Sequence, residues 1–378
     1  MPHGHLARNA GLVALLAIVL AALAASFRFA LVYRVRAGFP RRNPPTATPD
    51  LVGLPWVNVM IPRPDGPPLP GWWMPAPSAS AMGSLTVAAA PAVVLVHGWE
   101  SARDKVLPHA LVLNAIGISV LAFDVRGHGE NPEEALPLSV GEYAADTQAA
   151  VRWLRSRPSG EVGRIGIVGH SMGAAGSLVA AARLPDVAAV VAIAAPAGPS
   201  RLTRQTFRLV NLPIPDVVAW PLAWLTTRVY LRPRGHTIGA VSAGRAVREI
   251  GAPVLLVHGT DDGVVPVEDV LRLARARRRA LPAAVTEVLV IDGGRHSWLY
   301  ELPPFRVGVA RFLARHLGGP LAPAVAGALA ETVRAVRPPE AERLAAVDAE
   351  PGGLSSLLGL FRTPRTRPGR EPGGPRPS

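Results

Sequence analysis

The chain of 378 residues contains no cysteine, which excludes disulfide bonds, thiolate nucleophiles and cysteine-ligated zinc or iron–sulfur centres. Lys105 is the only lysine, so arginine carries almost all of the positive charge. Aromatic residues make up only 5% of the chain and do not alternate with basic residues in any stripe. The formal net charge of +13 therefore does not predict nucleic-acid binding.

The excess positive charge lies at the two ends of the chain. Residues 1–45 hold six arginines and no acidic residue, and residues 361–378 hold five arginines and Glu371, so the 315 residues between them carry only +3. Hydrophobic residues make up 49% of the chain, which is enough for a large core. We therefore expect a folded central part with basic ends.

One long apolar run lies near the N-terminus. Leu12–Phe27 holds no charge, and if Arg28 is tolerated the run continues to Tyr33. As a helix these 22 residues would be about 33 Å long, enough to cross a hydrocarbon core of about 30 Å, with the arginine near one end. Residues 1–36 are therefore predicted to be a membrane anchor. The alternative is a cleaved signal peptide, with Ala22-Leu23-Ala24 as its cleavage site.

The arginines around this run favour one orientation in a membrane. Four of them, Arg34, Arg36, Arg41 and Arg42, follow the run, against Arg8 and the amino group before it. By the positive-inside rule, the protein is then a single-pass membrane protein whose C-terminal body lies in the cytoplasm. A cleaved signal peptide would instead lead to an exported body.

After a linker at residues 37–51, the chain alternates short apolar runs with helix-length segments up to about residue 318. Each run is bounded by Gly, Pro or Asp, and the six are Val93–His97, Ser119–Asp124, Arg164–Val168, Val187–Ala194, Val254–His258 and Val285–Ile291. Apolar strands that alternate with helices are typical of an α/β fold, with a mostly parallel sheet and helices on both faces.

The two flanks of this region have their own patterns. Trp56–Pro62 and Gly71–Met74 predict an antiparallel hairpin at one edge of the sheet. Residues 319–378 are rich in Ala, Pro, Gly and Arg, and we expect a mostly disordered tail, with Leu354–Phe361 as a candidate for a short amphipathic helix.

The strongest chemical signal is Gly169-His170-Ser171-Met172-Gly173, between a predicted strand and the helical segment Ala174–Leu184. A serine on a sharp strand-to-helix turn takes a strained backbone, and glycine two positions to either side avoids steric clash. The turn places the Ser171 hydroxyl at the carboxyl end of the sheet and the Met172 amide at a helix N-terminus, where it can stabilise an oxyanion. No G-x-G-x-x-G pattern is present here, and we expect neither a cofactor nor a metal.

A nucleophilic serine needs a base, and the base needs an orienting carboxylate. His296 follows the last predicted strand in a glycine-containing loop and is the candidate base. The predicted strand Val254–His258 is followed by two adjacent carboxylates, Asp261 and Asp262. The predicted strand Val187–Ala194 is followed by no carboxylate until Asp216. Spacing alone does not choose between the two adjacent carboxylates.

The other polar residues near strand ends are interpreted as structural. Imidazoles at such positions most often pack and hydrogen-bond to nearby backbone, and loop carboxylates most often fix their own loop. The residues interpreted in this way are His97, His128, His170, His258, Asp124, Arg126 and, at the start of a helix, Asp146. His3-x-His5 lacks a third ligand and does not predict a metal site.

Four motifs, together with the order Ser, Asp, His along the chain, resemble those of the α/β-hydrolase family over residues 52–318. The motifs are His97-Gly98-Trp99-Glu100, Asp124-Val125-Arg126-Gly127-His128-Gly129, the Gly169–Gly173 turn, and Gly259-x-x-Asp262-x-x-x-Pro266 with His296 behind it. In this family the acid usually lies three residues after the glycine and four before the proline, which selects Asp262. The resemblance also implies that the Trp99 amide joins the Met172 amide in the oxyanion hole.

The order of the motifs and the N-terminal anchor resemble, more narrowly, the membrane-anchored esterase-like branch described as Bem46-like. Asn131 departs from that pattern, because many relatives have serine there. In the α/β-hydrolase fold a lid is inserted after the sixth strand, which here corresponds to residues 197–249. This segment is rich in large apolar residues and arginines: Phe207, Leu209, Val210, Leu212, Ile214, Val217, Val218, Trp220, Leu222, Trp224, Leu225, Arg201, Arg204 and Arg208. It is either an ordinary helical cap or an apolar lid that lies against a membrane or admits acyl chains.

The sequence therefore predicts a serine hydrolase that cleaves carboxylic esters through an acyl-enzyme, with lipid or acyl esters as candidate substrates. Ser171 is the expected nucleophile, His296 the base and Asp262 the orienting acid. A serine peptidase and an acyltransferase are alternatives on the same fold, and a non-catalytic membrane-anchored scaffold is an alternative from another class. The expected partners are a small-molecule or lipid ester and, through the N-terminal helix, a membrane.

Overall fold

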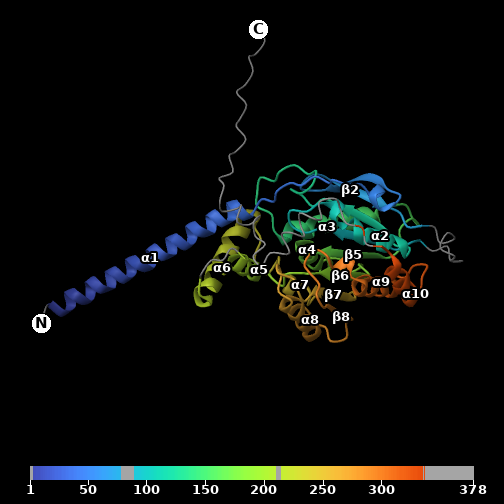
Figure 1. Ribbon diagram of the computed structural model, residues 1–378. Coiled ribbons are helices and arrows are strands. Elements are labelled where there is room, and N and C mark those ends of the chain that lie inside the picture. The colour runs from blue at the N-terminus through green and yellow to red at the C-terminus, as the bar shows by residue number, and fades with distance from the viewer. Residues whose placement is uncertain (1–2, 78–88, 210–213, 335, 337–378) are drawn as a thin grey trace, which may run out of the picture.

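The computed structural model describes the whole chain except residues 1–2, 78–88, 210–213, 335 and 337–378. Its centre is one sheet of eight strands in the order β1-β2-β4-β3-β5-β6-β7-β8 (Figure 1). The strands are β1 (Val57–Arg63), β2 (Gly66–Met74), β3 (Ala92–Val96), β4 (Ser119–Phe123), β5 (Ile165–His170), β6 (Ala189–Ile193), β7 (Val254–Gly259) and β8 (Thr286–Ile291). The last six are parallel, and β1 and β2 form the antiparallel hairpin predicted at one edge.

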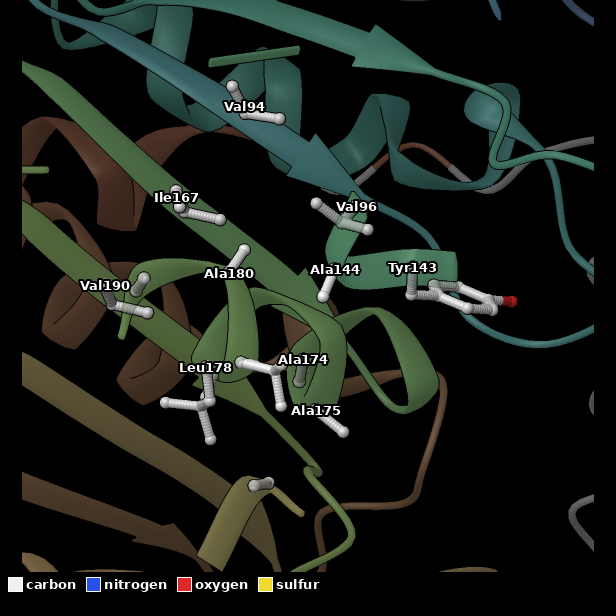
Figure 2. Close-up of a cluster of buried hydrophobic side chains, with 14 of the residues drawn as sticks. Val94, Val96, Tyr143, Ala144, Ile167, Ala174, Ala175, Leu178, Ala180 and Val190 are labelled. Carbon is white, nitrogen blue, oxygen red and sulfur yellow. The ribbon is translucent and has the colours of Figure 1, made fainter. Parts of the chain in front are cut away.

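The central strands are apolar on both faces because helices cover both sides of the sheet. In β3, Val94 and Val96 contribute to one core cluster while Val93 and Leu95 contribute to the other, and all four are buried. The first cluster is shown in Figure 2, where strand valines and isoleucines face small and large apolar side chains of α3 and α4. The predicted α/β fold with a mostly parallel sheet is confirmed.

The helices divide between the two faces of the sheet. One core cluster takes side chains from α3 (Val140–Arg155), α4 (Met172–Ala181), α7 (Ala243–Ala246) and α8 (Glu268–Ala280). The other takes them from α2 (Leu107–Ala115), α9 (Pro303–Leu317) and α10 (Pro323–Thr332). Short 3-10 turns lie at Pro49–Val52, Arg103–Val106, Arg232–Arg234 and Leu299–Glu301.

The helix α10 differs from the expectation of disorder after residue 318. Its alanines Ala326 and Ala330 are fully buried against α9, because small side chains allow two helices to approach closely. Arg306 of α9 donates to the carbonyl oxygens of Ala330 and Glu331, at 3.1 and 3.2 Å, and so caps the end of α10. Composition alone does not distinguish such a helix from a tail. Residues 337–378, including Leu354–Phe361, lie outside the described residues.

The first helix, α1 (His3–Ala37), projects away from the body, and its C-terminal end meets α5 (Pro199–Leu209) and α6 (Asp216–Leu231) (Figure 1). Asn9–Ala37 is long and apolar enough to cross a membrane, and the most apolar 18-residue stretch within it has a mean hydropathy of 2.6. The rings of Phe29 and Tyr33 lie 5.5 and 6.1 Å from the ring of Phe207 in α5. The predicted lid region is therefore mostly helical where the structure describes it, with a non-helical stretch at residues 235–242, and it contacts the predicted anchor.

Candidate active site

Ser171 lies at the turn between β5 and α4. Its φ of 55° and ψ of −120° are a conformation that residues with a side chain rarely adopt. Glycines two residues away make the turn possible. A Cβ at Gly169 would lie 2.4 Å from the Oγ of Ser177, and one at Gly173 would lie 2.4 Å from the carbonyl oxygen of His97. The strained turn exists because both neighbouring positions lack side chains.

The loops after β7 and β8 reach the same edge of the sheet, because parallel strands end together. These two loops touch through glycines: a Cβ at Gly259 would lie only 1.9 Å from the carbonyl oxygen of Gly294. The amide of Asp261 donates to that same oxygen at 3.0 Å. This close approach places the acid-bearing loop against the histidine-bearing loop.

The three side chains selected from the sequence lie in a row at this edge. Nε2 of His296 is 3.0 Å from Oγ of Ser171, and Nδ1 of His296 is 2.7 Å from Oδ2 of Asp262. His296 is only 8% exposed, and the Asp262 side chain is fully buried. The arrangement can move a proton from a serine hydroxyl to an imidazole that a carboxylate holds in place.

The carboxylate of Asp262 is held by several donors. Oδ1 accepts the amides of Val264 and Val265, each at 2.8 Å, and Oδ2 lies 3.2 Å from Nε2 of His258. Burial raises the pKa of Asp262, but the nearby His296 and the hydrogen bonds outweigh burial and hold this pKa well below its usual range. The ionised carboxylate accepts a hydrogen bond from Nδ1–H of His296, which makes Nε2 the nitrogen that accepts the hydrogen bond of the serine hydroxyl.

The two amides expected to form the oxyanion hole flank Ser171. Met172 is the first residue of α4, and amides of a first helical turn have no acceptor within the helix. A Cβ at Gly98 would lie 3.3 Å from the Cβ of Ser171, so the Gly98–Trp99 peptide runs beside the nucleophile. The positions of both amides suit the role implied by the resemblance.

The Gly98–Trp99 peptide is fixed from its carbonyl side. Nδ1 of His97 donates to the Gly98 carbonyl oxygen at 2.8 Å, and the Tyr143 hydroxyl lies 3.0 Å from the same oxygen. The carbonyl of Gly98 and the amide of Trp99 belong to one rigid plane. Hydrogen bonds to that carbonyl therefore set the direction of the Trp99 amide.

Two buried histidines in this network are neutral. Burial lowers the pKa of His97 to about 4, and its Nε2 accepts the Val125 amide at 3.0 Å. Burial, and then the nearby His97, lowers the pKa of His128 to about 3. Nδ1 of His128 lies 3.0 Å from the Arg126 carbonyl oxygen, and its Nε2 lies 3.0 Å from the Tyr143 hydroxyl. The neutral His97 ring thus uses one nitrogen as donor and the other as acceptor.

Other carboxylates at the same edge are paired with arginines. Asp124, directly after β4, forms an ion pair with Arg103. Asp146 in α3 accepts from Nη2 and Nε of Arg126 at 2.5 and 2.9 Å. The expectation that Asp146 supports a helix start is wrong, because a capping box beginning at Ser139 supports that start and Asp146 lies further along the helix.

The rejected candidate acids lie elsewhere. Asp261 is exposed and accepts a hydrogen bond from Thr260 at 3.1 Å. Asp216 begins α6 and pairs with Arg204. Among the described residues, no group of three or more His, Asp or Glu side chains is placed to hold a metal ion.

Sequence reasoning missed contacts that three residues make with this site. His258 bonds to the Val265 carbonyl oxygen, as expected of a structural histidine, but it also contacts Asp262. Nε2 of His170 donates to the His296 carbonyl oxygen at 2.8 Å, with the two rings 4.8 Å apart. The four-residue spacing between His258 and Asp262 could have indicated their contact. Nothing in the sequence indicated the third residue, Tyr143, whose hydroxyl contacts the Gly98 carbonyl oxygen.

The sheet, the strained serine turn after β5 and the histidine loop after β8 are those of serine hydrolases with the α/β-hydrolase fold. The family model described as "Serine aminopeptidase, S33" matches residues 88–241. An uncharacterized protein of Mycobacterium tuberculosis (strain H37Rv) is 30% identical over 240 residues, which cover 64% of this chain and 72% of that protein. The chain therefore belongs to the α/β-hydrolase family, within the serine hydrolase superfamily.

Two further matches are esterases. The bifunctional esterase/perhydrolase DCH of Acinetobacter calcoaceticus is 29% identical over 218 residues, covering 47% of this chain and 77% of that protein. A solved structure of an esterase from Pyrococcus furiosus covers 74% of this chain and 97% of its own, with a TM-score of 0.58 and 23% identity. The second match supports the fold alone.

Proposed function

We propose that the protein hydrolyses carboxylic esters through an acyl-enzyme intermediate on Ser171. The observation that carries this proposal is the row of hydrogen bonds from Ser171 through His296 to Asp262, with 3.0 and 2.7 Å between the bonded atoms. A serine–histidine–carboxylate row at the strained turn of a hydrolase sheet is an arrangement that catalyses acyl transfer.

In the first half of the reaction, His296 takes the hydroxyl proton as Oγ of Ser171 attacks the ester carbonyl carbon. Asp262 stabilises the imidazolium that forms. The amides of Met172 and Trp99 bind the developing oxyanion, an interaction worth about 3 kcal/mol for each donor. His296 then passes its proton to the departing alkoxide, which leaves the acyl group bound to Ser171.

In the second half, His296 removes a proton from water as the water oxygen attacks the acyl carbon. The second tetrahedral oxyanion occupies the same two amides. Collapse of this intermediate breaks the bond to Oγ, and His296 returns the proton to Ser171. The products are an acid and an alcohol, and the protein groups end in their starting state.

Esterase activity is favoured over peptidase activity as the first function to test. The matched Acinetobacter protein is named an esterase, although the matched family model is described as an aminopeptidase. An alkoxide is also a better leaving group than an amide anion, so a triad competent for amides cleaves activated esters as well. A peptidase would hydrolyse amide substrates at rates comparable to esters, and an acyltransferase would partition the acyl group to an added alcohol rather than to water.

The test combines a fluorophosphonate probe with p-nitrophenyl esters of several acyl lengths. We expect labelling and turnover in the wild-type protein and neither in Ser171→Ala. Ser156→Ala is the matched control, because this exposed hydroxyl bonds only to the Trp153 carbonyl oxygen and has no histidine beside it. Labelling that survives Ser171→Ala would reject the nucleophile, and absence of labelling in the folded wild-type protein would support the scaffold alternative.

We further propose that α1 anchors the protein in a membrane with the catalytic body on the cytoplasmic side and that the substrate is a lipid or acyl ester. The support is the apolar length of Asn9–Ala37 and the arginines that follow it. Mass analysis of the mature N-terminus separates an anchor from a cleaved signal. Equal turnover of short and long acyl esters would reject the lipid part of the proposal.

A further inference from the structure

The cap helix α6 carries an apolar face that the described residues of the protein leave uncovered. Val217 is 81% exposed, Val218 53%, Trp220 42% and Trp224 50%, whereas Ala219 on the opposite side of the helix is fully buried. Burial of such side chains is worth about 1.5–3 kcal/mol each, so a cluster of four over two helical turns is costly to leave in water.

This face lies next to the predicted membrane anchor. Tyr230 near the end of α6 packs on Tyr33, with ring centroids 6.1 Å apart, and its hydroxyl lies 3.4 Å from the Ala37 carbonyl oxygen. One to two turns earlier, Ala223 joins the cluster that contains Tyr33 and Phe29. The contacts show that the two helices run in the same general direction, and Figure 1 shows that they meet near the C-terminal end of α1, with α6 inclined to α1.

The contacts between α1 and α6 indicate which residues of α1 lie at the same depth as the apolar face of α6. Val217 precedes Tyr230 by about 20 Å of helix, and the same distance measured back from Ala37 reaches about Ala24, which is the furthest level along α1 that the inclined α6 helix can reach. That position lies within the uncharged run Leu12–Phe27. If this run is inside a bilayer, the first turns of α6 lie at the boundary of the same bilayer.

The charges around the face also suit a lipid surface. The guanidinium of Arg228 lies 4.8 Å from the ring centroid of Trp224, and that of Arg201 lies 5.8 Å from the ring centroid of Trp220. Exposed Arg28 lies on α1 at the end of the uncharged run. Tryptophan next to arginine is typical of the headgroup region, where the ring is buried and the cation meets phosphates.

We propose that the first half of α6 is embedded in the interface of the bilayer that α1 crosses, with Val217, Val218, Trp220 and Trp224 among the upper acyl segments. The inference rests on the proposed anchor but not on ester hydrolysis. It also has a consequence for access. The cap begins at Pro199, just after β6, at the sheet edge that carries Ser171. A cap seated on lipid holds that edge close to membrane-borne esters.

The absence of native cysteine allows a direct test in the full-length protein, because one introduced thiol is the only labelling site. Three variants, Val217→Cys, Leu20→Cys and Val325→Cys, are labelled with an environment-sensitive fluorophore and reconstituted in phosphatidylcholine–phosphatidylglycerol vesicles. Val325 is the matched control, because it is an exposed valine on α10, at 53% exposure. Nitroxide groups are placed on the lipid acyl chains, near either the headgroup or the chain end.

At position 217 we expect a blue-shifted emission that the shallow nitroxide quenches more than the deep one. At position 20 we expect stronger quenching by the deep nitroxide, and at position 325 neither a shift nor quenching. A probe at 217 that behaves like the probe at 325, while position 20 is quenched, would overturn the inference and leave the anchor intact. A blue shift at 217 without lipid quenching would also overturn it, in favour of contact with a second copy or another protein. Absence of quenching at position 20 would reject the anchor and the inference together.

Discussion

Two groups of buried carboxylates lie at the same edge of the sheet and differ in their partners. On one half, Asp262 faces His296 and His258 and accepts two backbone amides. On the other half, Asp124 faces Arg103, and Asp146 faces Arg126. The first carboxylate belongs to a row that ends at a serine hydroxyl, and the other two fix loops.

The partner decides what a buried carboxylate can do. A guanidinium keeps its proton at every ordinary pH, so a carboxylate–arginine pair is electrostatic and static. An imidazole gains and loses a proton near neutral pH, so a carboxylate–histidine pair can support proton transfer. A buried acid after a strand therefore marks a site only when a histidine contacts it. Mutation of the carboxylate that contacts histidines should therefore lower activity. Mutation of a carboxylate that contacts an arginine should instead lower stability.

The largest expected effect is at Asp262, in the half of the sheet edge where the carboxylate contacts histidines. Asp262→Asn should lower kcat by about 10⁴-fold, because an amide in place of the carboxylate favours the wrong tautomer of His296. The measurement is ester turnover together with a urea unfolding curve. Asp261→Asn is the matched control and should keep kcat within twofold. A smaller loss in Asp262→Asn than in Asp261→Asn would reverse the assignment of the acid.

The next prediction concerns the arginine half, which is the half of the sheet edge where carboxylates pair with arginines. Asp146→Asn should lower the free energy of unfolding by about 3 kcal/mol, because it leaves the charge of Arg126 buried with weaker compensation. The kcat of the protein that remains folded should stay near the wild-type value. Asp65→Asn is the control, since this half-exposed carboxylate also binds Arg126 but should cost less than about 1 kcal/mol. A large fall in kcat at unchanged stability would contradict the static role.

The sequence predicted those features of this sheet edge that depend on local geometry. The Ser171 turn could be found because its backbone strain requires glycine on both sides, and the parallel sheet because its strands are apolar on both faces. Asp262 was preferred over Asp261 only through the resemblance to a family. Spacing could not decide between them, because both follow the same strand and the choice depends on where the His296 loop approaches.

What the sequence could not predict depends on contacts between distant segments. The α10 helix resembles a tail in composition, and only its packing on α9 and the arginine at its end show otherwise. Tyr143 lies in an ordinary amphipathic helix, and its contact with the Gly98 carbonyl oxygen spans 45 residues of chain. Such contacts follow from the completed fold rather than from a motif.

A third prediction concerns the neutral histidines on the arginine half. The pKa of His128 is about 3 in the folded protein and about 6.5 in an unfolded chain. Between these values only the unfolded chain binds the proton, so stability is fully present above about pH 6.5 and is lost as pH falls towards 3. Each such histidine adds up to about 1.4 kcal/mol per pH unit to the slope.

His128→Gln should reduce this slope by about that amount in urea unfolding of the detergent-solubilised protein between pH 6 and pH 5. Asp262 contributes little in this window, because it has a depressed pKa when folded and a pKa of about 3.9 when unfolded. Asp124, whose pKa burial raises to about 6, does titrate in this window, but it contributes equally to the variant and the wild-type protein and cancels in the comparison. The stability that Asp262 contributes is lost only at lower pH. Equal slopes in the variant and the wild-type protein would show that His128 does not remain neutral on folding.

The smallest expected effect tests the link between the two halves. Tyr143 contacts His128 on the arginine half and the Gly98 carbonyl oxygen beside the nucleophile. Tyr143→Phe removes a net hydrogen bond worth about 1 kcal/mol, and we expect kcat to fall by about fivefold. KM should change little, because a displaced Trp99 amide weakens binding of the oxyanion more than binding of the ester.

Tyr230→Phe is the matched control for this last change. Its hydroxyl is also buried and donates to a backbone carbonyl, that of Leu138, but it lies beneath the cap and the anchor rather than beside Ser171. The two variants should lose similar stability, and only Tyr143→Phe should lower kcat. Equal kcat values would mean that the Trp99 peptide keeps its direction without the tyrosine, and the two halves of the edge would then be mechanically independent.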